Sequence, residues 1–275
     1  MKQILITGAT DGIGLESAKQ LAQQGHHVHL VGRSPAKTEA ALTAVRRHGT
    51  ANSFLCDFAD LDAVRRLAKE VPDRLDRIDV LVNNAGSVFK TRTVTTDGFE
   101  ATFAVNHLAG FLLTESLRDL VVASAPARIV FTSSVGHYNG TMDFADLGFE
   151  HGYSIMKGYS RSKLANVLYT RRLARELTGT GVTVNALHPG AVATNIWSGA
   201  PAFAKPVLSL AKRVAMISPE VGGSRITFLA TDPSVEGVTG SYFDGNRPKE
   251  PSALALDAAL GDRLYDASRE LVGLA

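Results

Sequence analysis

The sequence lacks the features that would place it in several large classes of protein. Only one of its 275 residues, Cys56, is a cysteine, so an internal disulfide cannot form and a reducing compartment is expected. No uninterrupted apolar run reaches the ~18 residues of a membrane-spanning helix. The formal net charge is only +2, and arginine pairs are scattered along the chain, which disfavours nucleic-acid binding.

Other absences concern the organisation of the chain. The first apolar run starts so soon after Met1 that no signal peptide fits before it, and we expect a cytoplasmic protein. Neither a repeat nor a long linker divides the sequence, so residues 1–275 are expected to form one domain. The apolar neighbours of Cys56 favour a buried thiol over a reactive one. We expect no metal site.

What the sequence does contain is a regular alternation of two kinds of segment. Short aliphatic or β-branched runs alternate with longer helical patterns, which predicts a parallel sheet covered on both faces, a doubly wound α/β fold. The seven expected strands are residues 3–7, 27–31, 53–56, 80–83, 128–132, 182–187 and 241–243. The main expected helices are residues 14–24, 35–49 after an N-cap at Ser34, 98–123 capped by Asp97, and 159–178.

A glycine-rich turn follows the first of these strands. Gly8 permits a tight turn, Gly12 lets the backbone approach a phosphate, and Gly14 allows the next helix to pack closely. The N-terminus of that helix presents unpaired N–H groups to an anion. The turn therefore predicts a dinucleotide site, although an ordinary strand-to-helix turn could have the same composition. The expected contacts are Gly8, Thr10, Asp11, Gly12, Ile13 and Gly14.

Further motifs occur in a fixed order along the chain. They are Asn83-Asn84-Ala85-Gly86, Val105-Asn106-His107, Ser133-Ser134, Tyr159-Ser160-Arg161-Ser162-Lys163 and His188-Pro189-Gly190. Together with the glycine-rich turn, they make the chain resemble the short-chain dehydrogenase/reductase family over nearly its full length. The run from Ser162 to Asn166 and the terminal residues 257–274 are similar to the retinol-dehydrogenase-like branch. This resemblance implies a single-domain Rossmann fold and an oxidoreductase.

Tyr159 is the expected general acid/base. A free phenol has a pKa near 10, so a neutral-pH base requires the anion to be favoured by ~4 kcal/mol. Lys163 lies one helical turn away, and a unit charge at ~4 Å contributes about that amount at an effective dielectric of ~20. Tyr153 and Lys157 have the same spacing, but Gly158 would weaken a helix starting there, and only the residues after Tyr159 match the family.

Two further residues complete the expected catalytic group. Ser134 is placed to donate a hydrogen bond to a carbonyl oxygen. Its neighbour Ser133 is the alternative, and the resemblance favours the second serine. For Asn106 the resemblance implies a bend in its helix and a proton relay from Lys163, where a surface asparagine is the plainer interpretation. The segment between Ser134 and Tyr159 is longer than is usual in the family.

The second strand is followed by Gly32-Arg33, where an NAD enzyme would usually carry an acid. A guanidinium binds a 2′-phosphate, so NADP(H) is expected to be preferred over NAD(H), although Asp11 argues mildly against it and Arg33 could simply be solvated. The remaining cofactor contacts implied by the resemblance are Asp57, Phe58, Asn83, Ala85, Gly86, Tyr159, Lys163, Pro189, Gly190, Val192 and Thr194.

The substrate and partners are less visible in the sequence. Residues 191–218 are apolar and could form a lid, which favours a small apolar ketone, aldehyde or alcohol as substrate. A homodimer or homotetramer through the helices at 98–123 and 159–178 is expected by analogy, with a monomer as the alternative. Two other functions stay open: a non-catalytic dinucleotide-binding redox sensor and an NAD(P)-dependent epimerase.

Overall fold

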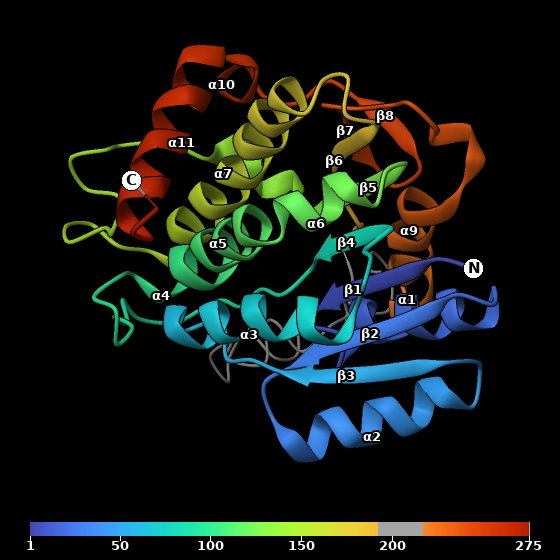
Figure 1. Ribbon diagram of the computed structural model, residues 1–275. Helices are drawn as coiled ribbons and strands as arrows, with labels where there is room; N and C mark the ends of the chain where they lie inside the picture. The colour runs from blue at the N-terminus through green and yellow to red at the C-terminus, as the bar shows by residue number, and fades with distance from the viewer. Residues whose placement is uncertain (192–216, 275) are drawn as a thin grey trace.

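A mostly parallel sheet forms the middle layer of the protein, with helices on both sides (Figure 1). The computed structural model describes residues 1–191 and 217–274. Across the sheet the strand order is β3-β2-β1-β4-β5-β6-β7-β8. The strands are β1 (Gln3–Thr7), β2 (His27–Gly32), β3 (Ala51–Leu55), β4 (Val80–Asn83), β5 (Ala127–Thr132), β6 (Val182–His188), β7 (Tyr242–Asp244) and β8 (Arg247–Lys249).

The helices form two layers, each closed by its own apolar cluster. One face of the sheet packs against α1 (Gly12–Gln23), α2 (Pro35–Arg46) and α9 (Pro219–Thr231). The other face packs against α3 (Leu61–Arg74), α5 (Ala109–Ser116) and α7 (Ile155–Glu176). Shorter helices and the last one complete the chain: α4 (Ala101–Phe103), η1 (Ala104–Leu108), α6 (Arg118–Ala123), η2 (Val135–Asn139), η5 (Pro233–Val235), α10 (Ala253–Leu256) and α11 (Ala258–Leu271).

Alternation along β1 explains why the sheet is covered twice. Ile4 and Ile6 belong to one apolar cluster and Leu5 to the other, and all three are fully buried. Successive side chains of a strand point to opposite faces, so a wholly apolar strand needs a helix layer on each side. Cys56, just after β3, is buried as expected, and burial raises the pKa of its thiol to about 12.

The order of the strands creates a crevice beside β1. The chain moves outward from β1 to β2 and β3, then returns so that β4 pairs with the other side of β1. Helices leaving β1 and β4 therefore diverge to opposite faces, and the carboxyl ends of these two strands border an open crevice. This is where the glycine-rich turn lies.

The sheet differs from expectation at its last edge. It has eight strands rather than seven, because β8 pairs antiparallel with β7. The two strands are joined at Gly245-Asn246, and Gly245 has a φ of +63°, which suits the first central position of a hairpin turn. Pro248 has no backbone N–H, so the sequence of β8 does not look like that of a strand. An edge strand nevertheless tolerates a proline.

The expected helix boundaries are confirmed only in part. Ser34 caps α2, with Pro35 as its first residue. The long helix expected at residues 98–123 instead begins at Ala101 and is interrupted by the π-helical segment η1. Asp97 does not cap it: the carboxylate accepts a hydrogen bond from the Leu61 amide of α3 at 3.0 Å. Glu100 is the cap, accepting from two amides of α4.

The last helix covers the face through which subunits were expected to pair. Figure 1 shows α11 lying along α7. The ring of Tyr265 stacks on that of Tyr169 at 6.3 Å, and its hydroxyl donates to Glu115 of α5 at 3.2 Å. Asp262 forms an ion pair with Arg175 of α7. Part of the α5–α7 face is thus covered by the same chain, and the expected homodimer or homotetramer stays a prediction.

Candidate active site

The glycine-rich turn has the geometry that backbone contact with an anion needs. Gly8 and Gly12 have φ values of +64° and +54°, which other residues rarely adopt. A β-carbon at Gly14 would lie 2.4 Å from the Gly8 oxygen and 2.5 Å from Asn84 Nδ2. Asp11 caps α1 by accepting from the Gly12 amide at 2.7 Å. The loop is therefore packed as tightly as a pyrophosphate cradle requires.

Asn84 holds this loop in place, a role that the sequence did not reveal. Its Nδ2 atom donates to the carbonyl oxygens of Thr7 and Gly8 at 3.0 and 3.1 Å. Its Oδ1 atom accepts from the Thr132 hydroxyl at 3.3 Å. One side chain thus joins the ends of β1, β4 and β5. In the sequence, the only indication of this role was that Asn84 is a second asparagine directly after a buried strand.

Arg33 and Asp57 stand together at the ends of β2 and β3. Their Nη1 and Oδ2 atoms are 3.9 Å apart, and the side chains are 73% and 44% exposed. An exposed pair at this distance contributes little to stability, so the guanidinium is free to turn toward a ligand. Behind them, a β-carbon at Gly32 would lie 2.3 Å from Thr10. Ile13 packs at the edge of the core beneath the turn.

Two expected cofactor contacts have their side chains elsewhere. Asn83 is buried, and its Nδ2 atom donates to the Thr114 hydroxyl of α5 at 2.9 Å. Phe58 is buried in the apolar core. Backbone atoms of these two residues remain for a ligand, so their expected contacts with a cofactor stay a prediction for the main chain.

Ala85 and Gly86 link the glycine-rich turn to the next part of the site. A β-carbon at Gly8 would lie 2.8 Å from the Ala85 Cα atom. A β-carbon at Gly86 would lie 3.3 Å from Asn106 Oδ1 and 3.6 Å from Lys163 Nζ. Gly86 itself is exposed. The motif after β4 therefore forms one wall of the crevice, and Lys163 stands directly behind it.

Lys163 is buried in α7, and its ammonium group faces the end of β5. The Nζ atom donates to the Thr132 carbonyl at 3.0 Å and lies 5.6 Å from the centroid of the Tyr159 ring. Burial lowers the pKa of Lys163 to about 8. Tyr159 and Lys163 thus face the same place from successive turns of one helix.

Two features of the polypeptide act on the pKa of Tyr159 in opposite directions. Burial raises the pKa of the phenol above its ordinary value, and a hydrogen bond with Ser134 works in the opposite direction. The cause of the raised pKa is burial, which removes water from the anion. The expected lowering by Lys163 together with the positive nicotinamide of the oxidised cofactor stays a prediction.

The structure distinguishes the two serines after β5. Ser133 donates its hydroxyl to the Lys163 carbonyl at 2.8 Å, so it braces α7. Ser134 faces Tyr159: a β-carbon at Gly136 would lie 3.3 Å from the tyrosine ring and 3.5 Å from Ser134 Oγ. Of the two serines, Ser134 is the one whose hydroxyl lies beside the phenol.

Both polar groups of the second tyrosine–lysine pair donate to backbone carbonyls. Tyr153 precedes α7 and donates its hydroxyl to the Phe89 carbonyl at 2.7 Å. Lys157 is exposed, with Nζ 3.5 Å from the Gly152 carbonyl. The helix begins earlier than predicted, at Ile155, and carries Gly158 in its first turn despite the expected cost. The Tyr153 ring packs against Gly158, where a β-carbon would lie 3.1 Å from it.

Asn106 lies in the middle of the π-helical segment, where a widened turn redirects its side chain. Its Oδ1 atom accepts from the Ser87 amide at 2.7 Å. Its Nδ2 atom donates to the Ser162 hydroxyl at 3.0 Å, and this hydroxyl donates to the Tyr159 carbonyl at 2.8 Å. The asparagine is therefore a buried bridge between the wall at Gly86 and the helix that carries Tyr159.

Arg161 explains the long segment between Ser134 and Tyr159. This buried arginine donates to the Thr141 and Leu147 carbonyls at 3.0 and 3.1 Å. Its guanidinium also lies 3.5 Å from the centroid of the Phe149 ring. The arginine thereby holds this segment against α7. In the sequence, the only indication of this role was the position of Arg161 between Tyr159 and Lys163.

Pro189 and Gly190, after β6, are held by α9. Arg225 of α9 donates to the Pro189 carbonyl at 3.0 Å. Gly190 has a φ of +98°, and a β-carbon there would lie 2.6 Å from Arg225. Val192, Thr194 and most of the expected lid lie outside the described residues.

Residues 1–191 and 217–274 contain no cluster of metal-ligating side chains. In the same part of the chain, no helix has the length and apolar character needed to cross a bilayer.

Comparisons with known proteins agree with this geometry. Residues 2–203 match the family model described as short chain dehydrogenase. The chain is 40% identical to mouse retinol dehydrogenase 14 over 99% of its length and 86% of that protein. It is 39% identical to DnrU from Streptomyces sp. (strain C5), a candidate daunorubicin C-13 ketoreductase, over 99% of this chain and 93% of that one.

Solved structures show the same fold. An uncharacterized protein from Mycobacterium paratuberculosis superposes with a TM-score of 0.80 at 30% identity, over 99% of this chain and 94% of that one. A candidate NAD(P)-dependent gluconate 5-dehydrogenase from Beutenbergia cavernae, with bound NADP at low occupancy, gives 0.72 at 30% identity, over 89% and 95% of the two chains. The chain therefore belongs to the short-chain dehydrogenase family of oxidoreductases and is similar to its retinol dehydrogenases.

Proposed function

We propose that this protein is an NADP(H)-dependent oxidoreductase that interconverts an apolar ketone or aldehyde and the corresponding alcohol. The observation that carries the proposal is a continuous row of contacts, described above, that joins the glycine-rich turn to Ala85, Gly86, Lys163, Tyr159 and Ser134. A dinucleotide laid along this row has its phosphates at the N-terminus of α1 and its nicotinamide end beside Tyr159.

The residues of the crevice fit such a cofactor. The turn is packed so closely against Ala85 and Asn84 that β-carbons at Gly8 and Gly14 do not fit, and the lysine ammonium stands behind the exposed wall at Gly86. Arg33 supplies an exposed cation for a 2′-phosphate, and no acid follows β2 directly. These two features support a preference for NADP(H).

The chemistry divides between cofactor and protein. When bound, NADPH would supply the hydride that the carbonyl carbon needs, and Tyr159 holds the phenolic proton that the carbonyl oxygen takes up to complete the alcohol. Ser134 donates a hydrogen bond to that oxygen and directs it toward the phenol. In the reverse direction Tyr159 must become an anion. Burial opposes this, so the cation of Lys163 and the positive charge of the oxidised cofactor are both needed beside it.

We propose an apolar substrate because two exposed apolar side chains lie close to Ser134 and Tyr159 in the sequence. Val135, next to Ser134, is 51% exposed, and Met156, one helical turn before Tyr159, is 52% exposed. Large apolar side chains left open beside a crevice favour an apolar ligand. The relatives named for retinol and for a daunorubicin ketone support the same class.

The test is NADPH oxidation by the purified protein with all-trans-retinal, decanal and daunorubicin. Turnover is expected with at least one of them, and Tyr159→Phe is expected to lower kcat by ~1000-fold, the scale of lost general acid catalysis. Tyr153→Phe is the matched control and keeps wild-type kcat. NADPH binding without turnover of any carbonyl would favour the redox-sensor alternative, and full activity in Tyr159→Phe would refute the mechanism.

A further inference from the structure

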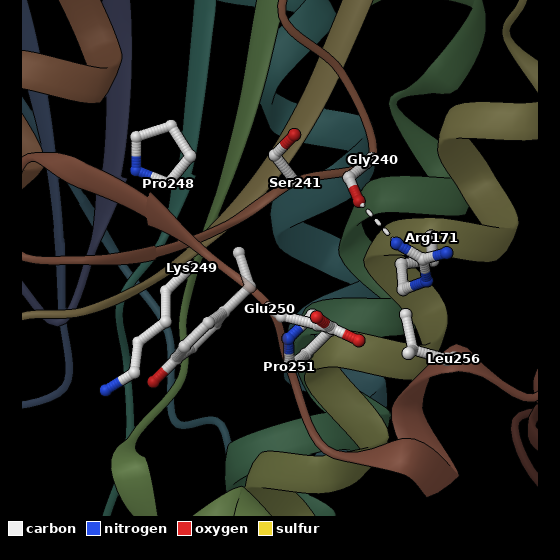
Figure 2. Close-up of a pocket in the computed structure, with 9 residues that line it drawn as sticks. Arg171, Gly240, Ser241, Pro248, Lys249, Glu250, Pro251 and Leu256 are labelled. Carbon is white, nitrogen blue, oxygen red and sulfur yellow. Dashed lines mark hydrogen bonds between the residues drawn. The ribbon is translucent and has the colours of Figure 1, made fainter.

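The segment after β8 returns to the active site. We call residues 249–252, which begin with the last residue of β8, the strap. Figure 2 shows Lys249, Glu250 and Pro251 lining a groove between β8 and α7, with Arg171 donating to the Gly240 carbonyl across its far side. The strap leads from the last strand into α10, and it passes directly beside η2, the short helix that follows Ser134.

Two consecutive residues of η2 hold the strap. Tyr138 donates its hydroxyl to the Glu250 carbonyl at 2.6 Å. His137 accepts a hydrogen bond at Nε2 from the Ser252 amide at 3.1 Å. Both strap atoms belong to the main chain, so these contacts fix the position of the backbone rather than of a mobile side chain.

The other ring nitrogen of His137 reaches the proposed catalytic serine. Nδ1 donates to the Ser134 carbonyl at 2.7 Å. A carbonyl only accepts and an amide only donates, so the proton must sit on Nδ1 and the lone pair on Nε2. The ring is fully buried between Tyr138 and Tyr242, with centroids 4.1 and 4.5 Å away.

The orientation of Ser134 depends on this backbone contact. Ser134 precedes η2 and accepts at Oγ from the Gly136 amide at 3.1 Å. Its side chain can keep facing Tyr159 only while the main chain from Ser134 to Gly136 is held. The imidazole contacts the carbonyl of that same residue.

We propose that His137 is a positioning residue that couples the strap to Ser134. Its neutral ring holds the serine carbonyl on one side and the strap amide on the other, so that the serine hydroxyl stays aligned with the phenol. This inference rests on the proposed function of Ser134. It adds that the C-terminal part of the chain, distant in sequence, takes part in aligning the active site.

The first test compares variants of the ring, using NADPH and whichever of retinal, decanal or daunorubicin turns over fastest. His137→Phe keeps the ring volume but loses both hydrogen bonds, and kcat is expected to fall by ~10-fold with KM for NADPH unchanged. His137→Asn keeps a donor near Nδ1 and is expected to lose only ~3-fold. Equal kcat in the wild type and His137→Phe would overturn the proposal.

The second test removes the strap contact without touching the ring, and it stands even if His137→Phe does not fold. Ser252 has a φ of −60°, which proline can adopt, so Ser252→Pro removes the amide donor at little strain. Ser252→Ala keeps the amide and loses only the capping hydroxyl, making it the matched control. We expect kcat to fall by ~5-fold in Ser252→Pro and to stay within ~2-fold of wild type in Ser252→Ala. Equal values in the two variants would contradict the coupling.

The third test separates positioning from general structural support. In a Ser134→Ala background, adding His137→Phe should lower kcat by less than ~2-fold, because the group it aligns is already gone. A further ~10-fold loss there would show that His137 does not act through Ser134. If Ser134→Ala itself keeps wild-type kcat, the proposed role of the serine is refuted and this inference with it; if only His137→Phe keeps it, this inference alone is refuted.

Discussion

The two sides of the crevice are built from different materials. On the nucleotide side, at the ends of β1 to β4, the walls are main chain and glycine, and a side chain would not fit at Gly14. On the chemical side, at β5 and α7, the walls are buried polar groups such as Lys163 and Ser133. On the nucleotide side, we expect one added carbon atom to disrupt binding. On the chemical side, the buried charge of Lys163 lowers stability, so removing that charge should raise stability while it abolishes turnover.

Replacing Lys163 by methionine should produce the largest effect. Burial lowers its pKa from 10.5 to about 8, so between these values the unfolded chain binds more protons and stability rises with pH. Below pH 8 the folded protein holds a charged ammonium out of water, at a cost of about 3 kcal/mol from the size of the shift. Lys163→Met should therefore lose turnover while its free energy of unfolding rises by up to this amount at pH 7.

Urea denaturation at pH 7 and pH 10 measures this effect. The gain should shrink at the higher pH, where the wild-type lysine is neutral in the folded state and largely charged only in the unfolded chain. Lys157→Met removes an exposed lysine at the same spacing from a tyrosine and should change stability little. An equal change at both pH values in Lys163→Met would show that the buried charge is not the cause.

Adding a methyl group at Gly14 tests the nucleotide side. The new β-carbon would lie 2.4 Å from the Gly8 oxygen, so the turn must open, and we expect NADPH affinity to fall by ~100-fold in isothermal titration. Gly261→Ala is the control, because Gly261 is also helical but its nearest neighbour would be 3.6 Å away. That variant should bind normally and gain up to about 1 kcal/mol of stability from helix propensity. Comparable affinities in the two variants would disprove steric exclusion at the turn.

On the nucleotide side, the side chain of Arg33 is expected to determine the preference for NADPH over NADH. Arg33→Ala should raise KM for NADPH by ~10-fold and leave KM for NADH unchanged, because only NADPH carries the extra phosphate. The thermal midpoint should not move, since the pairing with Asp57 is long and exposed. Steady-state kinetics with both cofactors gives the answer, and similar increases for both would remove the assignment to NADP(H).

The same contrast explains what could be predicted from sequence. The strands from β1 to β6 and the glycine-rich turn follow from local rules, because apolar runs and glycines record burial and steric space directly. The short edge strand β8 was not predicted, because it contains a proline and its residues are exposed rather than apolar and buried. On the nucleotide side, the structure added mainly Asn84.

The chemical side depends on hydrogen bonds between segments far apart in the chain. The preference for Ser134 over Ser133 and the bend at Asn106 were expected only through the family resemblance. Their physical basis lies in the contact of Ser133 with Lys163 and in those of Asn106 with Ser87 and Ser162. Local propensity contains no information on such pairings. It also misplaced the start of α7, because the cost of Gly158 is offset by tertiary packing of the Tyr153 ring.

The lone thiol of Cys56 offers a practical consequence. It is buried, and its raised pKa leaves almost no thiolate in the folded state at neutral pH. A thiol-specific dye should therefore label only molecules in which this part of the sheet has opened. Since the chain has a single cysteine, the labelling rate reports one location without any engineered probe, and the opening of the nucleotide-side core can be timed directly.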